Sequence, residues 1–158
     1  MATFTATRAA STAPAFQAVG PGILCAAYGT IEVTANPVAA DVYEMCRIPA
    51  GAVVVGGRIY SDDLDTNVAE TLNLSVGWLN NGTDATNASG LGLIGVQGTD
   101  TVAGIKYEAG YNYYLGGVLA SDGPKTFAAE TVIAVTCVAT AATFAAGTLS
   151  VVVHYVNP

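Results

Sequence analysis

The sequence predicts an all-β fold, a two-sheet antiparallel sandwich that is jelly-roll-like and carries an extended N-terminal arm. The first observation is a series of short β-branched runs separated by Gly, Pro and Asn turn signals. The second is that alanine, although abundant, does not recur at helical spacing beside Leu, Glu or Lys. The third is length, because 158 residues form one domain that buries roughly 70% of its unfolded surface and needs no disulfide or metal.

The chain begins with a segment that has no core of its own. Ala, Thr and Ser dominate it, and Phe4 and Phe16 are its large apolar anchors. A Gly-Pro-Gly breaker closes the segment at residues 20–22. Alone, such a segment would lack order, so we expect another chain to hold it. We therefore assign residues 1–21 to the arm and residues 22–158 to the sandwich.

Two runs after the breaker are expected to form strands. Residues 23–34 form one strand, or a pair of strands that divides at Gly29. In residues 41–48 two sets of side chains alternate: Val42, Glu44, Cys46 and Ile48 on one side, and Tyr43, Met45 and Arg47 on the other. This period of two is typical of a strand.

A Pro-Ala-Gly turn at residues 49–51 leads into a Val-rich run. We expect residues 52–60 to form a strand buried on both faces, because three valines follow one another from Val53. A period of two returns in residues 72–79, where Leu72, Leu74, Val76 and Trp78 alternate with Asn73, Ser75, Gly77 and Leu79. The Asn- and Thr-rich residues 80–90 are expected to form a polar loop.

Three further strands are expected at residues 113–119, 131–138 and 148–156, which makes about eight in all. In the last of them, one side of the strand is predicted to carry Leu149, Val151, Val153 and Tyr155. We expect at most one helical turn, at residues 90–95 or 126–129.

The charge balance excludes two classes of partner. The net charge is −7, and the positive side chains are Arg8, Arg47, Arg58, Lys106 and Lys125. They form no cluster, whereas a protein that binds nucleic acid needs a basic stripe to neutralise phosphates. Attraction to an anionic membrane surface is disfavoured for the same reason. We therefore expect neither nucleic acid nor a membrane as a partner.

Apolar residues are in surplus. They make up 52% of the chain, and charged residues only 11%, against about 25% in an ordinary soluble domain. We expect part of the surface to be buried against other chains. Residues 131–153 carry no charge and are long enough to span a bilayer, but Thr and Ser interrupt them throughout. A β-hairpin explains them better.

The three cysteines indicate a chain folded in a reducing cytoplasm. Cys25, Cys46 and Cys137 are an odd number without a CxxC pair, and each lies in an apolar run. We expect all three to be buried as small hydrophobic side chains. One disulfide, within or between chains, is the alternative.

The sequence contains no recognisable catalytic or metal-binding motif. His154 is the only histidine, it lies in a predicted strand, and no nucleophile motif accompanies it. The acidic residues Asp62 to Asp65 could supply oxygen ligands for calcium, but Val68 and Leu74 stand where an EF-hand needs Gly and Glu. We expect a solvated acidic loop, no catalytic residue, no cofactor and no metal.

A tyrosine cluster is the most distinctive group of side chains. It comprises Tyr107, Tyr111, Tyr113 and Tyr114. Tyrosine combines a large apolar area with a polar tip, which suits packing inside a sandwich, a protein interface or a sugar-binding platform. We take the cluster, together with Phe4, Arg8 and Phe16 from the arm, as the candidate interface. A carbohydrate- or receptor-binding module remains the alternative.

One stretch of the sequence resembles a known class of protein. Residues 43–57, YEMCRIPAGAVVVGG, are similar to a strand, turn and Val-rich strand in the decoration (cement) proteins of tailed bacteriophage heads. Residues 72–90, LNLSVGWLNNGTDATNASG, resemble a companion segment, and the opening MATFTATRAA resembles the Thr/Ala arm of such proteins. Tail and fibre proteins of phages use similar strand-turn patterns.

The resemblance implies a mechanical function. A decoration protein is made in the cytoplasm of the bacterial host and binds the exterior of the assembled capsid. The resemblance therefore implies the major capsid protein as partner, self-association as a homotrimer, and an arm that reaches a neighbour. No enzymatic activity is implied.

Overall fold

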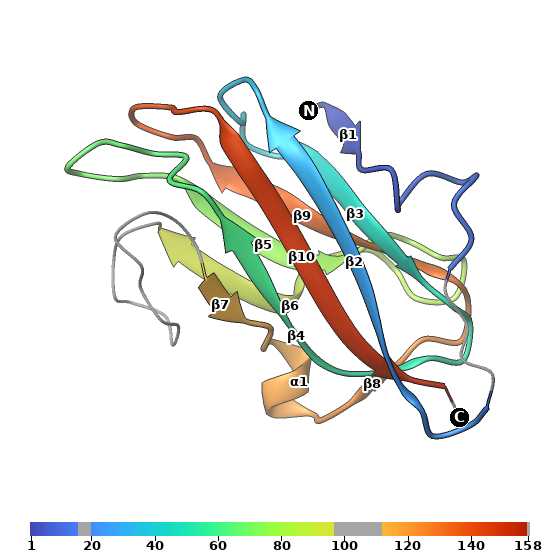
Figure 1. Ribbon diagram of the computed structural model, residues 1–158. Helices are drawn as coiled ribbons and strands as arrows, with labels where there is room; N and C mark the ends of the chain where they lie inside the picture. The colour runs from blue at the N-terminus through green and yellow to red at the C-terminus, as the bar shows by residue number, and fades with distance from the viewer. Residues whose placement is uncertain (16–19, 97–111, 158) are drawn as a thin grey trace.

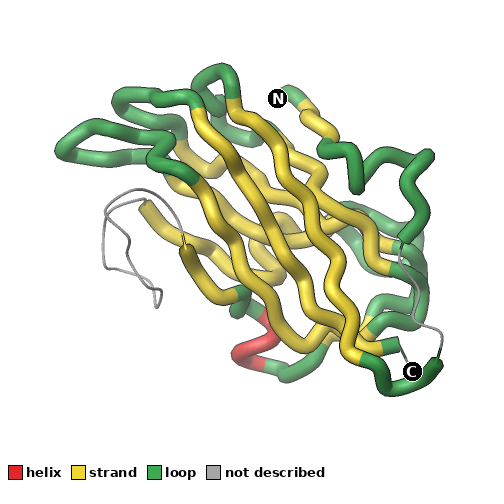
Figure 2. Tube along the Cα trace, viewed as in Figure 1, coloured by secondary structure: helices red, strands yellow, loops and turns green. Residues whose placement is uncertain are grey.

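The computed structural model describes residues 1–15, 20–96 and 112–157, and they form a two-layer β-sandwich (Figure 1, Figure 2). The predicted all-β sandwich is confirmed. Its strands are β1 (Thr3–Thr5), β2 (Leu24–Val33), β3 (Val42–Ile48), β4 (Val53–Ser61), β5 (Asn73–Trp78), β6 (Asn87–Val96), β7 (Asn112–Tyr114), β8 (Lys125–Thr126), β9 (Thr131–Ala139) and β10 (Gly147–Val156).

The strands are divided between two sheets. The first sheet has the order β1-β3-β9-β5-β6, and the second has β2-β10-β4-β7, with β8 paired to the start of β4. Neighbouring strands are antiparallel, as predicted, except that β1 runs parallel to β3. The chain changes sheets between β3 and β4, at the turn of residues 49–51. Gly51 has a φ of 81° there, and its N–H donates to the Phe127 carbonyl.

The core lies between the two sheets. In β10 the predicted alternation is confirmed, because Leu149, Val151, Val153 and Tyr155 are fully buried and the side chains between them are half-buried. The three cysteines are free and buried, also as predicted. Burial raises the pKa of the Cys46 thiol to about 12, so this thiol stays protonated and unreactive at neutral pH.

Two β-bulges alter the predicted burial pattern. The register of β3 against β9 slips between Glu44 and Cys46, so Met45 is an extra residue and both Met45 and Cys46 are buried. The register of β4 against β10 also slips, between His154 and Tyr155. The prediction that the valines of β4 are buried on both faces is wrong, because Val55 is 44% exposed.

At most one helical turn was predicted, and the described residues contain one, but its predicted position is wrong. Residues 90–95 lie within β6, Thr126 ends β8, and residues 127–129 follow without a helix. The one helical turn of the described residues is α1 (Val118–Ser121), which begins at the end of the stretch 113–119 that was predicted to be a strand. Gly117, with a φ of 58°, redirects the chain after β7 and allows this turn to begin.

The N-terminal segment lies on the sandwich of its own chain. β1 pairs with β3, and the rings of Phe4 and Tyr43 stack with centroids 5.0 Å apart. Ala6 and Ala9 are buried, and the Ala9 carbonyl accepts a 2.7 Å hydrogen bond from Arg47 Nε. The expectation that another chain holds this segment is therefore wrong up to Ala9. The open edge of β3 offers backbone groups for pairing, and the segment takes them.

Candidate functional site

The residues considered for catalysis and metal binding stay apart. No group of three His, Cys, Asp or Glu side chains in the described ranges could hold a metal ion. His154 is half-buried in β10, on the side that faces away from the core. Among the described residues no helix is long and apolar enough to cross a membrane.

The acidic loop after β4 contains a buried carboxylate. Asp65 is fully buried, which contradicts the expectation of a solvated loop at this position. Its carboxylate accepts hydrogen bonds of 2.8–3.0 Å from the backbone N–H groups of Thr71, Leu72, Ala142 and Thr143. Burial alone would raise the pKa of Asp65, but these hydrogen bonds outweigh it and hold the pKa at about 2. This carboxylate ties two loops together and has no need of a metal.

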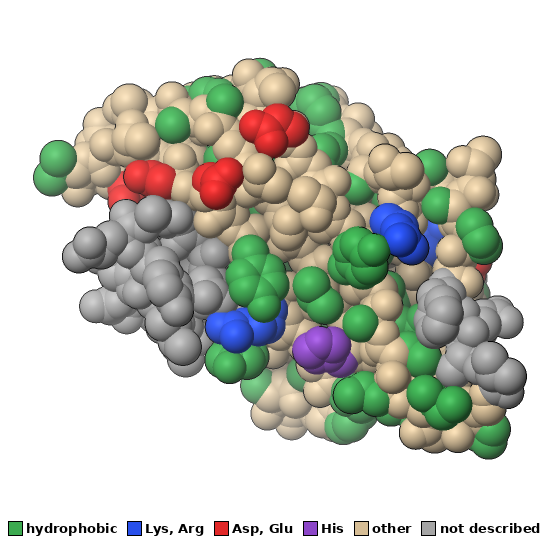
Figure 3. All heavy atoms as spheres, in the orientation of Figure 1, with side chains coloured by type: hydrophobic (Ala, Val, Ile, Leu, Met, Phe, Trp, Pro, Cys, Tyr) green, Lys and Arg blue, Asp and Glu red, His purple; other side chains and the backbone are tan. Residues whose placement is uncertain are grey.

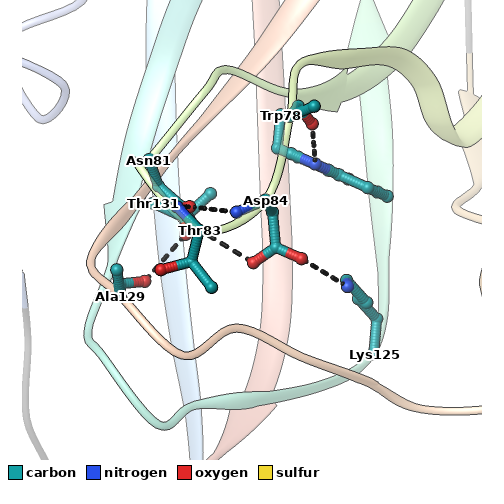
Figure 4. A network of polar contacts seen from close by, with 8 residues as sticks. Trp78, Asn81, Thr83, Asp84, Lys125, Ala129 and Thr131 are labelled. Atoms are coloured by element: carbon teal, nitrogen blue, oxygen red, sulfur yellow. Dashed lines mark hydrogen bonds and ion pairs between the residues drawn. The ribbon is translucent and has the colours of Figure 1, made fainter.

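A second polar network fixes the loop between β5 and β6 (Figure 4). Lys125 Nζ donates to Asp84 at 2.8 Å, and Asn81 Nδ2 donates both to Asp84 and to the Thr131 hydroxyl. The Trp78 indole N–H donates to the Ala85 carbonyl at 3.0 Å. The hydrogen bonds from Lys125 and Asn81 lower the pKa of Asp84. The network joins the loop to β8 and β9, so it stabilises one end of the sandwich.

We predict that Thr131→Val lowers the free energy of unfolding by about 1–2 kcal/mol. The Thr131 hydroxyl is buried, accepts from Asn81 at 2.7 Å and donates to the Ala129 carbonyl at 2.8 Å. Valine keeps the shape and leaves both partners short of a hydrogen bond. Urea unfolding measures the change. Thr136→Val, on the same strand and outside this network, is the control and should change stability much less.

A cavity of about 190 Å³ lies beside the network, next to α1. It is lined by Trp78, Asn87, Val118, Asp122, Gly123, Pro124 and Lys125. The ammonium group of Lys125 is already engaged there, by Asp84 and by the rings of Trp78 and Phe127, whose centroids lie 5.5 and 5.2 Å away. Two of the residues that line the cavity, Trp78 and Lys125, therefore belong to the structural network.

The outer face of the second sheet is different, because it exposes tyrosine and arginine side chains. Tyr28, Val152, Arg58 and Tyr114 stand opposite one another across β2, β10, β4 and β7. The Arg58 guanidinium lies 4.2 Å from the ring centroid of Tyr114 and 5.4 Å from that of Tyr60. We call this group, with Arg8, the tyrosine–arginine face.

Arg8 extends the tyrosine–arginine face from the N-terminal segment. Its guanidinium lies 4.7 Å from the ring centroid of Tyr28 and donates a 2.9 Å hydrogen bond to the Tyr28 hydroxyl. Figure 3 shows hydrophobic, Lys or Arg, and histidine side chains in the middle of this surface and carboxylates toward its upper end. Tyr28 is 48% exposed and Tyr114 is 61% exposed. Exposed tyrosine and arginine are the residues most enriched where proteins bind each other.

The structure brings only some of the predicted interface residues together. Arg8 and Tyr114 lie on the tyrosine–arginine face, whereas Phe4 stacks on Tyr43 at the edge of β3. Tyr113 pairs through its backbone with Ile59. Phe16, Tyr107 and Tyr111 lie outside the described residues.

The sequence analysis missed Tyr28, Arg58 and Tyr60. Tyr28 occupies an outward position of an alternating strand, between the buried Ala27 and Gly29. Arg58 and Tyr60 likewise flank the fully buried Ile59. The alternation of both strands could have identified these outward side chains, but only the pairing of β2 and β4 with β10 shows that they share one surface.

Among known proteins, the chain is similar to chains in the solved structures of phage capsids. No protein-family model matches the chain, and no curated protein matches it. Among solved structures, the chain is similar to one in the capsid of Ralstonia phage GP4, with a TM-score of 0.77 and 25% identity over 99% of both chains. A chain of the cyanophage Pam1 capsid asymmetric unit matches with a TM-score of 0.63 and 27% identity over 94% of both chains.

A third solved structure shares the fold. A chain of the acidic stable capsid of Helicobacter pylori bacteriophage KHP30 matches 88% of this chain and 91% of its own length, with a TM-score of 0.58. At 15% identity this match concerns the fold alone. Over nearly its full length, the chain is thus structurally similar to proteins of bacteriophage capsids.

Proposed function

We propose that this chain is a non-enzymatic structural protein of a phage virion that binds the outer surface of the assembled capsid and stabilises it. In this proposal it acts as a decoration protein, its partner is the major capsid protein, and it assembles as a homotrimer. The observation that carries the proposal is the match to a chain of the GP4 capsid, which covers 99% of both chains with a TM-score of 0.77.

Two features support decoration of the capsid in particular. Residues 43–57, which resemble decoration proteins, form β3, the turn that changes sheets and the beginning of β4. The resemblance therefore concerns the part of the chain that sets the sandwich topology. The chain also exposes large apolar side chains, among them Leu24 at 63% and Val138 at 46%.

The proposed mechanism is stabilisation by mass action. A protein that binds the assembled shell, and not its free subunits, shifts the equilibrium toward the shell by about 2.7 kcal/mol per site at a free concentration of roughly 100 times Kd. Each contact needs only modest strength, because the contact is repeated over the whole shell. Apolar burial suits this role, since screening by salt does not weaken it.

Binding to purified capsids tests the proposal. When the chain is added to capsids that lack it, we expect it to sediment with them up to a fixed ratio to the major capsid protein. We also expect the decorated capsids to release DNA at a higher temperature than bare ones. Unassembled capsid protein is the control and should bind little of the chain. Binding to tails, or no saturable binding to capsids, would contradict the proposal.

A further inference from the structure

We propose that the tyrosine–arginine face binds the same face of a second copy of this chain in a two-fold, face-to-face pairing. This goes beyond the proposed function, because it assigns the outer face of the second sheet to contact between copies. The proposal rests on composition, on the order of charges along the face and on the register of its strands.

Composition is the first argument. Across the middle of the sheet, Tyr28, Val152, Arg58 and Tyr114 form one row, and each belongs to a different strand. Tyrosine and arginine contribute much binding energy when buried in an interface, tyrosine because its large ring is desolvated with the loss of few rotamers and arginine because its planar guanidinium stacks and donates several hydrogen bonds. The rings already hold the Arg58 guanidinium in place, at 4.2 and 5.4 Å. Less conformational freedom is therefore lost on binding.

The order of charges along the strands is the second argument. The arginine row is followed by a polar row, in which the Thr30 and Ser150 hydroxyls are hydrogen-bonded at 2.8 Å. An acidic row comes next, where Thr148 donates from its hydroxyl to Glu32 at 3.1 Å and from its N–H to Asp62 at 2.7 Å. Glu32 lies four residues beyond Tyr28 on β2, so the arginine and acidic rows are roughly 13 Å apart.

This order is self-complementary under a two-fold rotation. An axis that runs along the polar row, between two facing sheets, reverses the strand direction and places the arginine row of one copy over the acidic row of the other. The rotation keeps each residue on its own side of the sheet. Arg58 of β4 then faces Asp62 of the second copy, which directly follows β4, and Arg8, which lies over Tyr28 of β2, faces Glu32. Complementary charges of this kind fix the register of an interface.

The local charges of this face, and not the net charge of the chain, favour a second copy as the occupant. The chain carries −7, and two like-charged molecules repel each other unless a local contact overcomes the repulsion. The tyrosine–arginine face brings two arginines and the only histidine to one surface, with carboxylates at its far end. Each copy thus presents both signs of charge to the other. On a shell decorated by trimers, this pairing would link neighbouring trimers.

Sedimentation of the purified full chain at increasing concentration tests the inference. We expect reversible dimerisation through this face that weakens at high salt. Arg8→Glu should raise the dissociation constant at least about ten-fold, and so should Glu32→Arg. The double variant R8E/E32R should restore the dissociation constant to within about three-fold of the wild type, because the two-fold axis repeats the swapped pair.

Variants that change no charge test whether misfolding accounts for the effects. Tyr28→Ala removes a half-exposed ring from the face and should also weaken dimerisation, whereas Val138→Ala, a similarly exposed position on β9 of the first sheet, should leave it unchanged. The inference would be overturned if neither the monomer nor the homotrimer paired further through this face at any concentration. So would variants of the face that keep normal self-association but lose capsid binding, because the face would then contact the shell. Loss of capsid binding by the wild type, with dimerisation intact, would refute only the proposed function.

Discussion

Replacing Asp65 with Ala should lower the free energy of unfolding by about 3–5 kcal/mol, a large share of the stability of a typical domain. The Asp65 carboxylate is fully buried and accepts hydrogen bonds from the N–H groups of Thr71, Leu72, Ala142 and Thr143. Without it, these backbone groups lose their acceptor, and each buried, unsatisfied N–H costs about 1–3 kcal/mol. Because water partly reaches these N–H groups, the total cost is smaller than the sum of the four single costs.

The effect reaches beyond the loop that contains Asp65. Thr71 and Leu72 lead into β5, which belongs to the first sheet, and Ala142 and Thr143 lie between β9 and β10. The carboxylate therefore joins the connection between β4 and β5 to the connection between β9 and β10. A backbone bridge between Asp65 and Phe144 lies at the same place. Loss of the carboxylate should loosen both connections at this end of the sandwich.

The low pKa of the same carboxylate makes the free energy of unfolding depend on pH. Its pKa is about 2 in the folded chain, against a usual value of 3.8, so the unfolded chain binds the proton more tightly. The charged form stabilises the fold fully above pH 4, and this stability, about 2 kcal/mol, is lost as the pH falls from about 4 to about 2. Urea unfolding of the wild type across this range should show the decrease, and Asp65→Ala should lack that part of it.

Asp63→Ala is the matched control for Asp65→Ala. Asp63 lies in the same loop, is only half-buried, and accepts a 3.2 Å hydrogen bond from the Asp65 N–H. Its removal should cost no more than about 1 kcal/mol. If Asp63→Ala and Asp65→Ala destabilised the chain equally, the loop charge as a whole, and not the buried carboxylate, would account for the effect.

The two aspartates also show what the sequence could predict and what it could not. β10 was predicted well, because one face of the strand packs on the core and the side chains alternate accordingly. β5 was also predicted as a strand, but its burial does not alternate, since every residue from Leu74 to Trp78 is buried. Nothing near Asp65 in the sequence distinguishes it from Asp62 or Asp63. Its burial depends on Ala142 and Thr143, which lie 77 and 78 residues away. Only the tertiary fold brings these backbone groups to it.

The same limit applies to the surface proposed for binding. A tyrosine cluster stands out in the sequence, but the exposed tyrosines that share a face with Arg58 come from three different strands. Tyr28, Tyr60 and Tyr114 meet only because β2, β10, β4 and β7 are neighbours in that order. Sequence periodicity predicts which way a side chain points from its strand. It does not predict which strands lie side by side, and a binding surface on a sheet depends on both.

Gly29→Ala should destabilise the chain by about 3 kcal/mol or more, although alanine is normally the better strand residue. The sequence suggested that Gly29 divides a run into two strands, but β2 continues through it without a break. At this point β2, of the second sheet, passes so close to β3, of the first, that a Cβ on Gly29 would lie 1.7 Å from the Met45 carbonyl oxygen. Backbone cannot move aside as a side chain can, so the two sheets would have to separate.

Gly56→Ala is the control that separates this clash from the general effect of replacing glycine. Gly56 also lies within a strand, β4, and a Cβ there would have no atom within 4 Å. Because alanine loses less backbone entropy on folding, Gly56→Ala should leave the free energy of unfolding unchanged or raise it by about 0.5–1 kcal/mol. Urea unfolding of both variants at equal protein concentration measures the difference. Equal stability of Gly29→Ala and the wild type would mean that β2 and β3 do not pack backbone to backbone, and the closure of the sandwich along this side would then need another explanation.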